Sequence, residues 1–280
     1  MELAYRIVDV FAEAPLTGNA LAVFPDAPGL PSELMQRIAR EMNLSETTFV
    51  TSAGDSRYSS RIFTPGAELP FAGHPTLGTA WVLRDAGAIS GDELTQETAA
   101  GKTPITFEAV RVWLERDGDG GADVADIAAL ASEFGIAPGL IGATWEAPGG
   151  PVELRPAIAD CGIRQLMVPV TSLEALTSLR ASDIREPEDS HGTYFFVRTG
   201  PRSVTARFFA PGLGVPEDPA TGSAAAGLGL YLGLRVGTGR IAISQGEQIW
   251  RPSTLHVRFT EGRVRVGGAV QPIAAGVLTL

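Results

Sequence analysis

The feature that most constrains the fold of this chain is a segment that occurs twice. Arg61-Ile-Phe-Thr-Pro-Gly66 and Arg207-Phe-Phe-Ala-Pro-Gly212 are each followed by a further proline. In both copies a β-rich run ends at the Pro-Gly turn and a helix-forming segment follows, opening at Gly73-His74-Pro75 in the first and at Thr221-Gly222-Ser223 in the second. A chance recurrence in a chain rich in proline and glycine would not explain the shared order. We therefore predict a duplicated unit of strand, turn and helix.

Apolar periodicity predicts the elements around these copies. In the first half we expect strands at 4–11, 21–24, 47–51, 57–63, 105–107 and 110–114, with helices at 31–42 and 75–86. In the second half we expect helices at 123–134 and 221–234, and strands at 153–158, 166–169, 193–199, 204–210, 240–244, 254–260 and 263–267, before a tail that ends in 276–280.

The clearest break in the chain is Asp117 to Gly121, with the sequence D-G-D-G-G. Glycine and aspartate favour turns over regular structure. We place the boundary between the two halves here, giving 1–118 and 119–269.

The composition excludes several classes of protein. Hydrophobic residues make up 44% and charged residues 19% of 280 residues, which is a globular profile. The formal net charge of −10 disfavours nucleic acid as a partner. No segment approaches eighteen uninterrupted apolar residues and no signal-peptide pattern opens the chain, so we expect neither a membrane span nor secretion. The single cysteine, Cys161, has no partner for an internal disulfide. We expect a cytoplasmic protein.

Five separated motifs resemble a known family in both order and spacing. They are Val8-Asp-Val-Phe11, Gly18-Asn19-Ala20, Asn43-Leu-Ser-Glu46-Thr-Thr-Phe49, Gly73-His74-Pro75 and Glu217-Asp-Pro-Ala-Thr-Gly-Ser223. Together they are similar to the phenazine-biosynthesis isomerases, the PhzF-like family within the diaminopimelate epimerase superfamily. The match runs from near residue 5 to the end of the sequence.

The resemblance implies an α+β fold of two pseudo-symmetric halves. Each half would be a curled β-sheet or barrel around a central helix, with the active site in the cleft between them. A C-terminal strand at about 270–280 would complete the first half. The family is also expected to be a homodimer, to act on a small anionic carboxylate substrate and to need no cofactor.

Glu46 is the candidate proton carrier. A proton shift beside a carboxylate needs a base whose pKa lies near the working pH, and desolvation in an apolar cleft would raise the pKa of a glutamate towards that value. From the residues alone, the favoured interpretation of Glu46 is an exposed glutamate in a loop between a helix and a strand. The resemblance makes it the general acid/base of a cofactor-independent isomerase.

The resemblance also gives catalytic roles to His74 and Asp218. Taken alone, both read as residues at helix starts, where the dipole disfavours a protonated histidine and free N–H groups stabilise an anion. The substrate-binding residues implied by the family motifs are Asn19, Gly73, Thr221, Gly222 and Ser223. The first turns at Gly73 and at Gly222-Ser223 would offer backbone N–H groups to a carboxylate.

The epimerase branch of the superfamily uses two cysteines to invert an α-carbon. By the resemblance, Gly73 and Asp218 stand in the places of those cysteines, and Cys161 reads as a small buried residue. Racemisation through a pair of thiols is therefore excluded, and one carboxylate that takes and returns a proton suits an isomerisation.

The same residues allow four other interpretations. Ser223, His74 and Asp218 could form a hydrolytic triad, but no G-x-S-x-G elbow surrounds the serine. The glycines at Gly212-Leu-Gly214 and Gly227-Leu-Gly229 lack the spacing of a dinucleotide fingerprint. Three scattered histidines offer no metal site. A protein that kept the fold as a small-molecule binder and lost turnover stays open.

Overall fold

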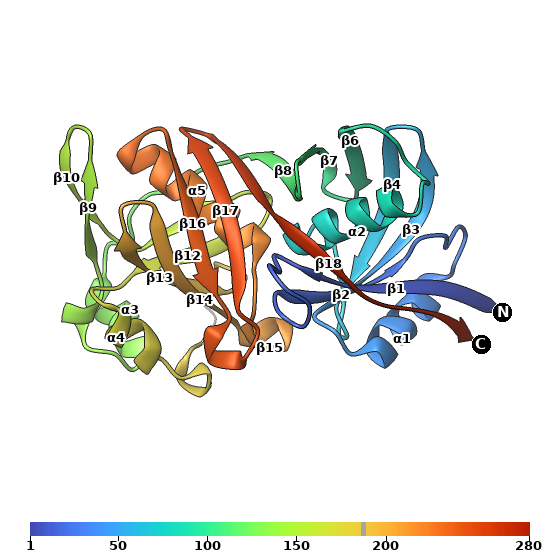
Figure 1. Cartoon of the computed structure of the whole chain (residues 1–280). Helices are drawn as coiled ribbons and strands as arrows, with labels where there is room; N and C mark the ends of the chain where they lie inside the picture. Colours follow the sequence, from blue (N-terminus) through green and yellow to red (C-terminus); the bar gives the residue numbers. More distant parts are fainter. Residues whose placement is uncertain (186–188) are drawn as a thin grey trace. The chain divides into compact units, whose positions relative to one another are not determined.

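The computed structural model describes residues 1–185 and 189–280, which form two compact units (Figure 1). Met1–Glu115 and Gly267–Leu280 make up the first unit, and Arg116–Val266 the second. The chain leaves the first unit within strand β8 (Arg111–Asp117) and returns to it within strand β18 (Arg263–Thr279). The sequence had placed the boundary after residue 118.

The first unit is a curled sheet around a central helix, α2 (Gly73–Asp85). Its hydrogen-bonded strands are, in order, β1 (Glu2–Val10), β2 (Asn19–Phe24), β3 (Glu46–Gly54), β4 (Arg57–Phe63), β6 (Glu93–Thr98), β7 (Gly101–Glu108) and β8. The short β5 (Glu68–Leu69) pairs with β4, and α1 (Ser32–Met42) packs outside with Met35 and Ile38 buried.

Helix α2 is buried on nearly all sides, as expected for a helix enclosed by a sheet. Gly78 allows this close packing, because a Cβ added there would lie 2.6 Å from Leu21 and 2.8 Å from Val10. A larger residue would push α2 away from β1 and β2.

The C-terminal strand completes the first unit. Glu2 to Val10 of β1 pair antiparallel with β18 from Thr279 back to Val270. The backbone N–H of Leu280 also donates to the carbonyl of Met1 at 2.8 Å, so the two ends lie side by side (Figure 1).

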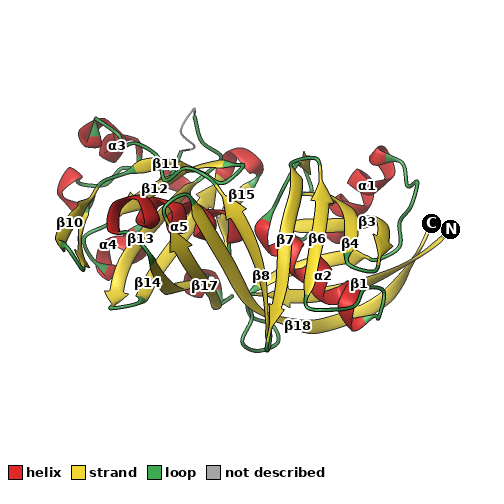
Figure 2. Cartoon of the chain, turned by 90° about the horizontal axis from the view of Figure 1, so that it is seen from above, coloured by secondary structure: helices red, strands yellow, loops and turns green. Residues whose placement is uncertain are grey.

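The second unit repeats the arrangement around α5 (Gly222–Val236), seen in Figure 2 among its strands. Its sheet order is β17 (Ser253–Thr260), β16 (Gly239–Gln245), β14 (Ser203–Ala210), β13 (Thr193–Gly200), β12 (Arg164–Pro169) and β11 (Ala157–Asp160). The strand β15 (Val215–Asp218) pairs with β14, and β9 (Ala143–Ala147) pairs with β10 (Gly150–Leu154) in a separate hairpin.

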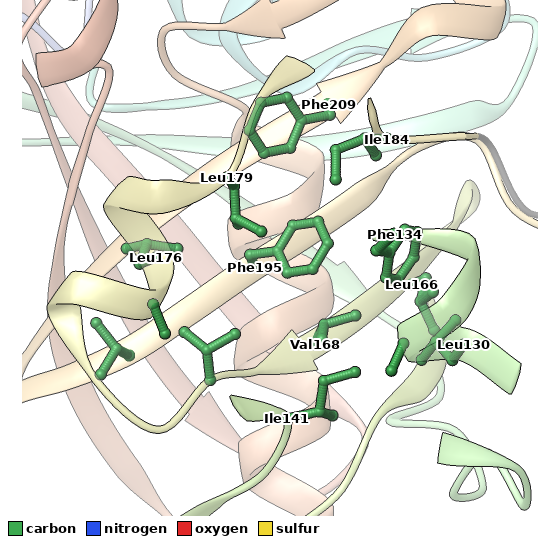
Figure 3. Close-up of a cluster of buried hydrophobic side chains, with 14 residues drawn as sticks. Leu130, Phe134, Ile141, Leu166, Val168, Leu176, Leu179, Ile184, Phe195 and Phe209 are labelled. Atoms are coloured by element: carbon green, nitrogen blue, oxygen red, sulfur yellow. The ribbon is translucent and has the colours of Figure 1, made fainter. Parts of the chain in front are cut away.

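A hydrophobic cluster lies on the outer face of this second sheet, where α3 (Ile127–Glu133) and α4 (Leu173–Ser178) cover it (Figure 3). Phe195 is in edge contact with Phe134 at 5.0 Å and with Phe209 at 5.9 Å between ring centroids. Burying one such ring contributes about 2 to 3 kcal/mol, so this cluster fixes the helices to the sheet.

The predicted duplication is confirmed by strand register and side-chain contacts. Phe49 pairs with Arg61 in the first unit as Phe195 pairs with Arg207 in the second. Arg61 binds Glu68 through two hydrogen bonds, and Arg207 binds Glu217 in the same way. The repeated Arg-x-Phe motif thus anchors the short strand that follows each Pro-Gly turn.

The bounds of three elements differ from the predictions. The single strand expected at 153–158 is divided between β10 and β11 by Arg155-Pro156, because proline lacks the N–H that a ladder needs. The strand at 263–267 and the C-terminal tail are one continuous strand, β18. The helix expected from residue 123 begins at Ile127, since the side chain of Asp126 caps it by accepting from the N–H of Ala129.

No helix in the described part of the chain has the length and apolarity needed to cross a membrane.

Candidate active site

Glu46 is placed by the start of a strand. Helix α1 ends at Asn43 in a left-handed conformation, and the chain then enters β3, of which Glu46 is the first residue. Strands β2 and β3 run parallel with Leu21 opposite Glu46. Asn19, the first residue of β2, therefore begins its strand at the same end of the sheet as Glu46.

His74 lies in the first turn of α2, and its ring contacts both of these residues. Its Nε2 is 3.3 Å from Oε2 of Glu46, and its Nδ1 is 3.3 Å from Nδ2 of Asn19. The side chain of His74 is only 4% exposed, while that of Glu46 is 15% exposed. The carboxylate of Glu46 thus lies against the buried ring of His74 and remains partly exposed.

Burial lowers the pKa of His74 to about 3, so its imidazole is neutral at physiological pH. A neutral ring carries one proton, and the neighbours decide which nitrogen holds it. The hydroxyl of Ser45 donates to Oδ1 of Asn19 at 2.9 Å, which leaves the amide of Asn19 as the donor to Nδ1. The proton of His74 accordingly sits on Nε2, where it faces the carboxylate of Glu46.

In the second unit, Asp218 lies at the end of β15, just before α5. One of its carboxylate oxygens, Oδ2, accepts from the hydroxyl of Thr221 at 2.5 Å. Gln245 of β16 donates to the carbonyl of Asp218 at 2.8 Å and to Oγ1 of Thr221 at 3.1 Å. Burial, and secondarily the charge of Asp218, raise the pKa of Tyr194 well above its usual range, so its hydroxyl stays protonated and donates to Oε1 of Gln245 at 2.9 Å.

Ser223 is held by a neighbouring strand. The amide Nε2 of Gln165 in β12 donates to Oγ of Ser223 at 3.1 Å, and both residues are buried. Because Oγ accepts this bond, its own O–H remains available to donate. Cys161 is fully buried, which confirms the prediction of a small buried residue, and burial raises its pKa to about 11.

The two central helices start without a side-chain cap. Ala72 before α2 has no acceptor, and Thr221 before α5 directs its hydroxyl to Asp218 instead. The backbone N–H groups of Gly73 and of Gly222-Ser223 lie in first turns, where no intrahelical partner exists. These helix starts are chemically suited to an anion.

The structure brings the predicted residues into two groups. Asn19, Glu46, Gly73 and His74 gather in the first unit, and Asp218, Thr221, Gly222 and Ser223 gather in the second. The sequence did not point to Ser45, Gln165, Tyr194 or Gln245. A signal existed only for Ser45, which directly precedes Glu46; the others are single polar residues within apolar strands.

The hydrolytic triad and the dinucleotide site find no support in these contacts. Both ring nitrogens of His74 already have partners in its own unit, whereas a hydrolytic triad needs a serine on one and a carboxylate on the other. The dinucleotide site is disfavoured because Gly229 is needed for packing: a Cβ added there would lie 2.5 Å from Val264. Among residues 1–185 and 189–280, no three His, Cys, Asp or Glu side chains are grouped as metal ligands would be.

Comparisons with known sequences show which family the chain belongs to. The family model described as phenazine biosynthesis-like protein matches residues 8–276. A trans-2,3-dihydro-3-hydroxyanthranilate isomerase of Pseudomonas chlororaphis is 41% identical, over 92% of this chain and 91% of its own length.

Solved structures show the same fold. A Bacillus anthracis phenazine biosynthesis protein of the PhzF family superposes with a TM-score of 0.85 at 24% identity, covering 100% of both chains. A hydroxyproline epimerase of Agrobacterium vitis matches with a TM-score of 0.65 at 12% identity, over 100% of this chain and 93% of its own. The fold is therefore that of the diaminopimelate epimerases. The chain belongs to the PhzF family of isomerases.

Proposed function

We propose that this isomerase moves a proton on a small carboxylate substrate without a cofactor, and that Glu46 carries the proton. The observation that supports this most is the contact between Glu46 and the neutral His74. It leaves a fixed, partly exposed carboxylate beside a buried N–H donor, which is what a general base on a rigid scaffold needs.

In this mechanism the carboxylate of Glu46 removes a proton from a carbon next to a π system of the substrate. The electron pair of that C–H bond moves into the adjacent π system. The protonated Glu46 then delivers the same proton to another carbon of that system, so no atom is gained or lost. The N–H of His74 lies beside the carboxylate and favours its charged form.

The proposal also gives roles to residues of the second unit. Gly222 and Ser223 bind the substrate carboxylate through the helix start and the serine hydroxyl, as Gly73 does at the start of α2. Asp218 and Thr221 form a buried acid and hydroxyl pair that takes part in proton transfer or binding of a polar substituent. The helix ends also stabilise the negative charge that develops on the substrate.

The relatives support one class of substrate. The 41% identical protein is named for trans-2,3-dihydro-3-hydroxyanthranilate, a cyclic carboxylate with hydroxyl and amino groups. We propose a cyclic carboxylate of this kind for the present chain. A second candidate, a binder on the same fold without turnover, is disfavoured because the Asn19–His74–Glu46 arrangement is intact.

Solvent exchange tests the proposal and separates the two candidates. The chain is incubated in heavy water with trans-2,3-dihydro-3-hydroxyanthranilate and with related cyclic amino carboxylates, and deuterium at carbon is followed by NMR. Isomerisation with deuterium incorporation into a C–H position is expected. Saturable binding with no exchange and no product would favour the binder.

We also propose that the chain is a homodimer, as the family resemblance implies. Light scattering should give twice the monomer mass at micromolar concentration, and a monomer at high concentration would contradict this.

A further inference from the structure

The second unit contains a cavity that the proposed reaction does not use. It has a volume of about 540 Å³ and is lined by Trp145, Arg202, Arg240, Ile241, Arg258 and Phe259, among others. We call it the arginine pocket. Its size falls in the usual range for small-molecule sites.

The arginine pocket concentrates positive charge in an acidic protein. The chain has a formal net charge of −10, yet three arginines and no aspartate or glutamate line this cavity in the described part of the chain. Arg202 and Arg240 take part in no ion pair among residues 1–185 and 189–280.

Two of the arginines are directly opposed. Arg240 of β16 and Arg258 of β17 are register partners in an antiparallel pair, and both are exposed. Side chains directly opposite in such a pair lie on the same face with Cβ atoms about 5 Å apart, and like charges there repel. An anion bound between these guanidinium groups would accept charge-assisted hydrogen bonds from both of them.

The walls add apolar surface. Pro148 and Pro201 form part of the lining, and Trp145 comes from the β9–β10 hairpin with the guanidinium of Arg198 over its ring at 4.7 Å. The pocket is also distinct from the Asp218 group. Arg240 lies at the start of β16 and Gln245 ends it, which separates them by about 17 Å of strand.

From this arrangement we propose that the arginine pocket binds a small organic anion with at least two negative charges, in carboxylate or phosphate groups, on a body that contacts the apolar wall.

Calorimetry on the full chain at low salt tests this proposal with two probes. Isophthalate presents two carboxylates on a flat ring, and pyrophosphate presents phosphates without an apolar body. At least one should bind with one-to-one stoichiometry, and the tighter of the two identifies the anionic group. Arg240→Ala/Arg258→Ala should weaken that binding at least tenfold.

Two controls keep the result specific. Arg37→Ala/Arg57→Ala makes the same charge change at exposed arginines elsewhere and should leave the affinity within twofold. Gly222→Val, which addresses the proposed carboxylate site, should not affect the probe either. Failure of both probes to bind, unchanged affinity in the Arg240/Arg258 variant, or loss of binding only in Gly222→Val would overturn the proposal. A changed oligomeric mass of the Arg240/Arg258 variant, together with no binding of either probe to the wild type, would also overturn the proposal.

Discussion

Gly192 occupies in the second unit the position that Glu46 occupies in the first. Thr47 pairs with Phe63 at the start of β3, and Thr193 pairs with Phe209 at the start of β13. Glu46 and Gly192 immediately precede these two threonines. The duplication has thus kept the strand and changed the residue at its entrance.

The second unit has no room for a carboxylate at this point. Gly192 has a φ of +105°, and a Cβ added there would lie 2.4 Å from the ring of Phe208. A pair of bases at equivalent positions of the two units is therefore ruled out by packing. This asymmetry supports the proposal of a single carboxylate that removes and returns the proton.

The first prediction concerns Glu46. Glu46→Gln keeps the shape but cannot accept a proton at neutral pH, so turnover should fall by about a hundredfold or more. Binding of 3-hydroxyanthranilate, an aromatic analogue, should survive in a fluorescence titration. Glu41→Gln, at an exposed helix position, is the matched control and should retain full activity. Near wild-type deuterium exchange by Glu46→Gln would move the base elsewhere, with Asp218 the next residue to test.

Asn19 was expected to bind substrate, but it is 1% exposed and bonds His74 and Ser45. We predict that it positions His74 by fixing its tautomer. Asn19→Asp replaces the donor to Nδ1 with an acceptor, so the ring proton should move to Nδ1 and the N–H facing Glu46 should be lost. The kcat should drop about tenfold or more, on the scale of one buried hydrogen bond, with a smaller effect on KM.

Nitrogen NMR of the imidazole checks this directly, because the two tautomers give different Nδ1 and Nε2 shifts. Asn43→Asp, at the exposed end of α1, should change neither the spectrum nor kcat. An unchanged His74 tautomer in Asn19→Asp would show that Asn19 does not act in this way.

The third prediction addresses the start of α5. Gly222→Val should abolish binding of 3-hydroxyanthranilate while the protein stays folded, because a side chain there would fill the anion position. Circular dichroism and the unfolding midpoint report folding separately from the titration. The control is Gly139→Val, where nothing lies within 4 Å of an added Cβ. Unchanged affinity in a folded Gly222→Val protein would remove this helix end from the site.

The fourth prediction is a pH dependence of stability. His74 has a pKa of about 3 in the folded protein, against about 6.5 when unfolded. Between these values the unfolded chain takes up a proton that the folded chain refuses, so stability falls as the pH is lowered below 6.5. By pH 4.5 the wild type should lose about 2 to 3 kcal/mol more than His74→Gln.

Urea unfolding at pH 7 and pH 4.5 measures this difference between the two proteins. His191→Gln removes an exposed histidine and should behave like the wild type. Equal acid sensitivity of wild type and His74→Gln would show that His74 is not kept neutral by burial.

The sequence predicted the central helices and the repeated motif well, because both depend on residues that are close together in the sequence. Gly73 begins α2 and Gly222 begins α5, within two residues of the predicted starts. The strand β6 was missed, since Glu93–Thr98 is largely polar and its pairing with β4 depends on residues far away in the sequence. The same holds for Gln165 and Gln245, whose buried hydrogen bonds exist only once strands and helix have packed.

The return of β18 to β1 also sets the order in which this protein can be completed on the ribosome. Every residue of the second unit, Arg116–Val266, is synthesised before Gly267–Leu280. The first unit has its own Met1–Glu115 exposed for the whole of that time, with the β18 side of β1 unfilled. The half that carries Glu46 is thus begun before the other half and completed only after it. The edge of β1 that pairs with β18 therefore stays open to proteases and chaperones until the end of β18 has been synthesised.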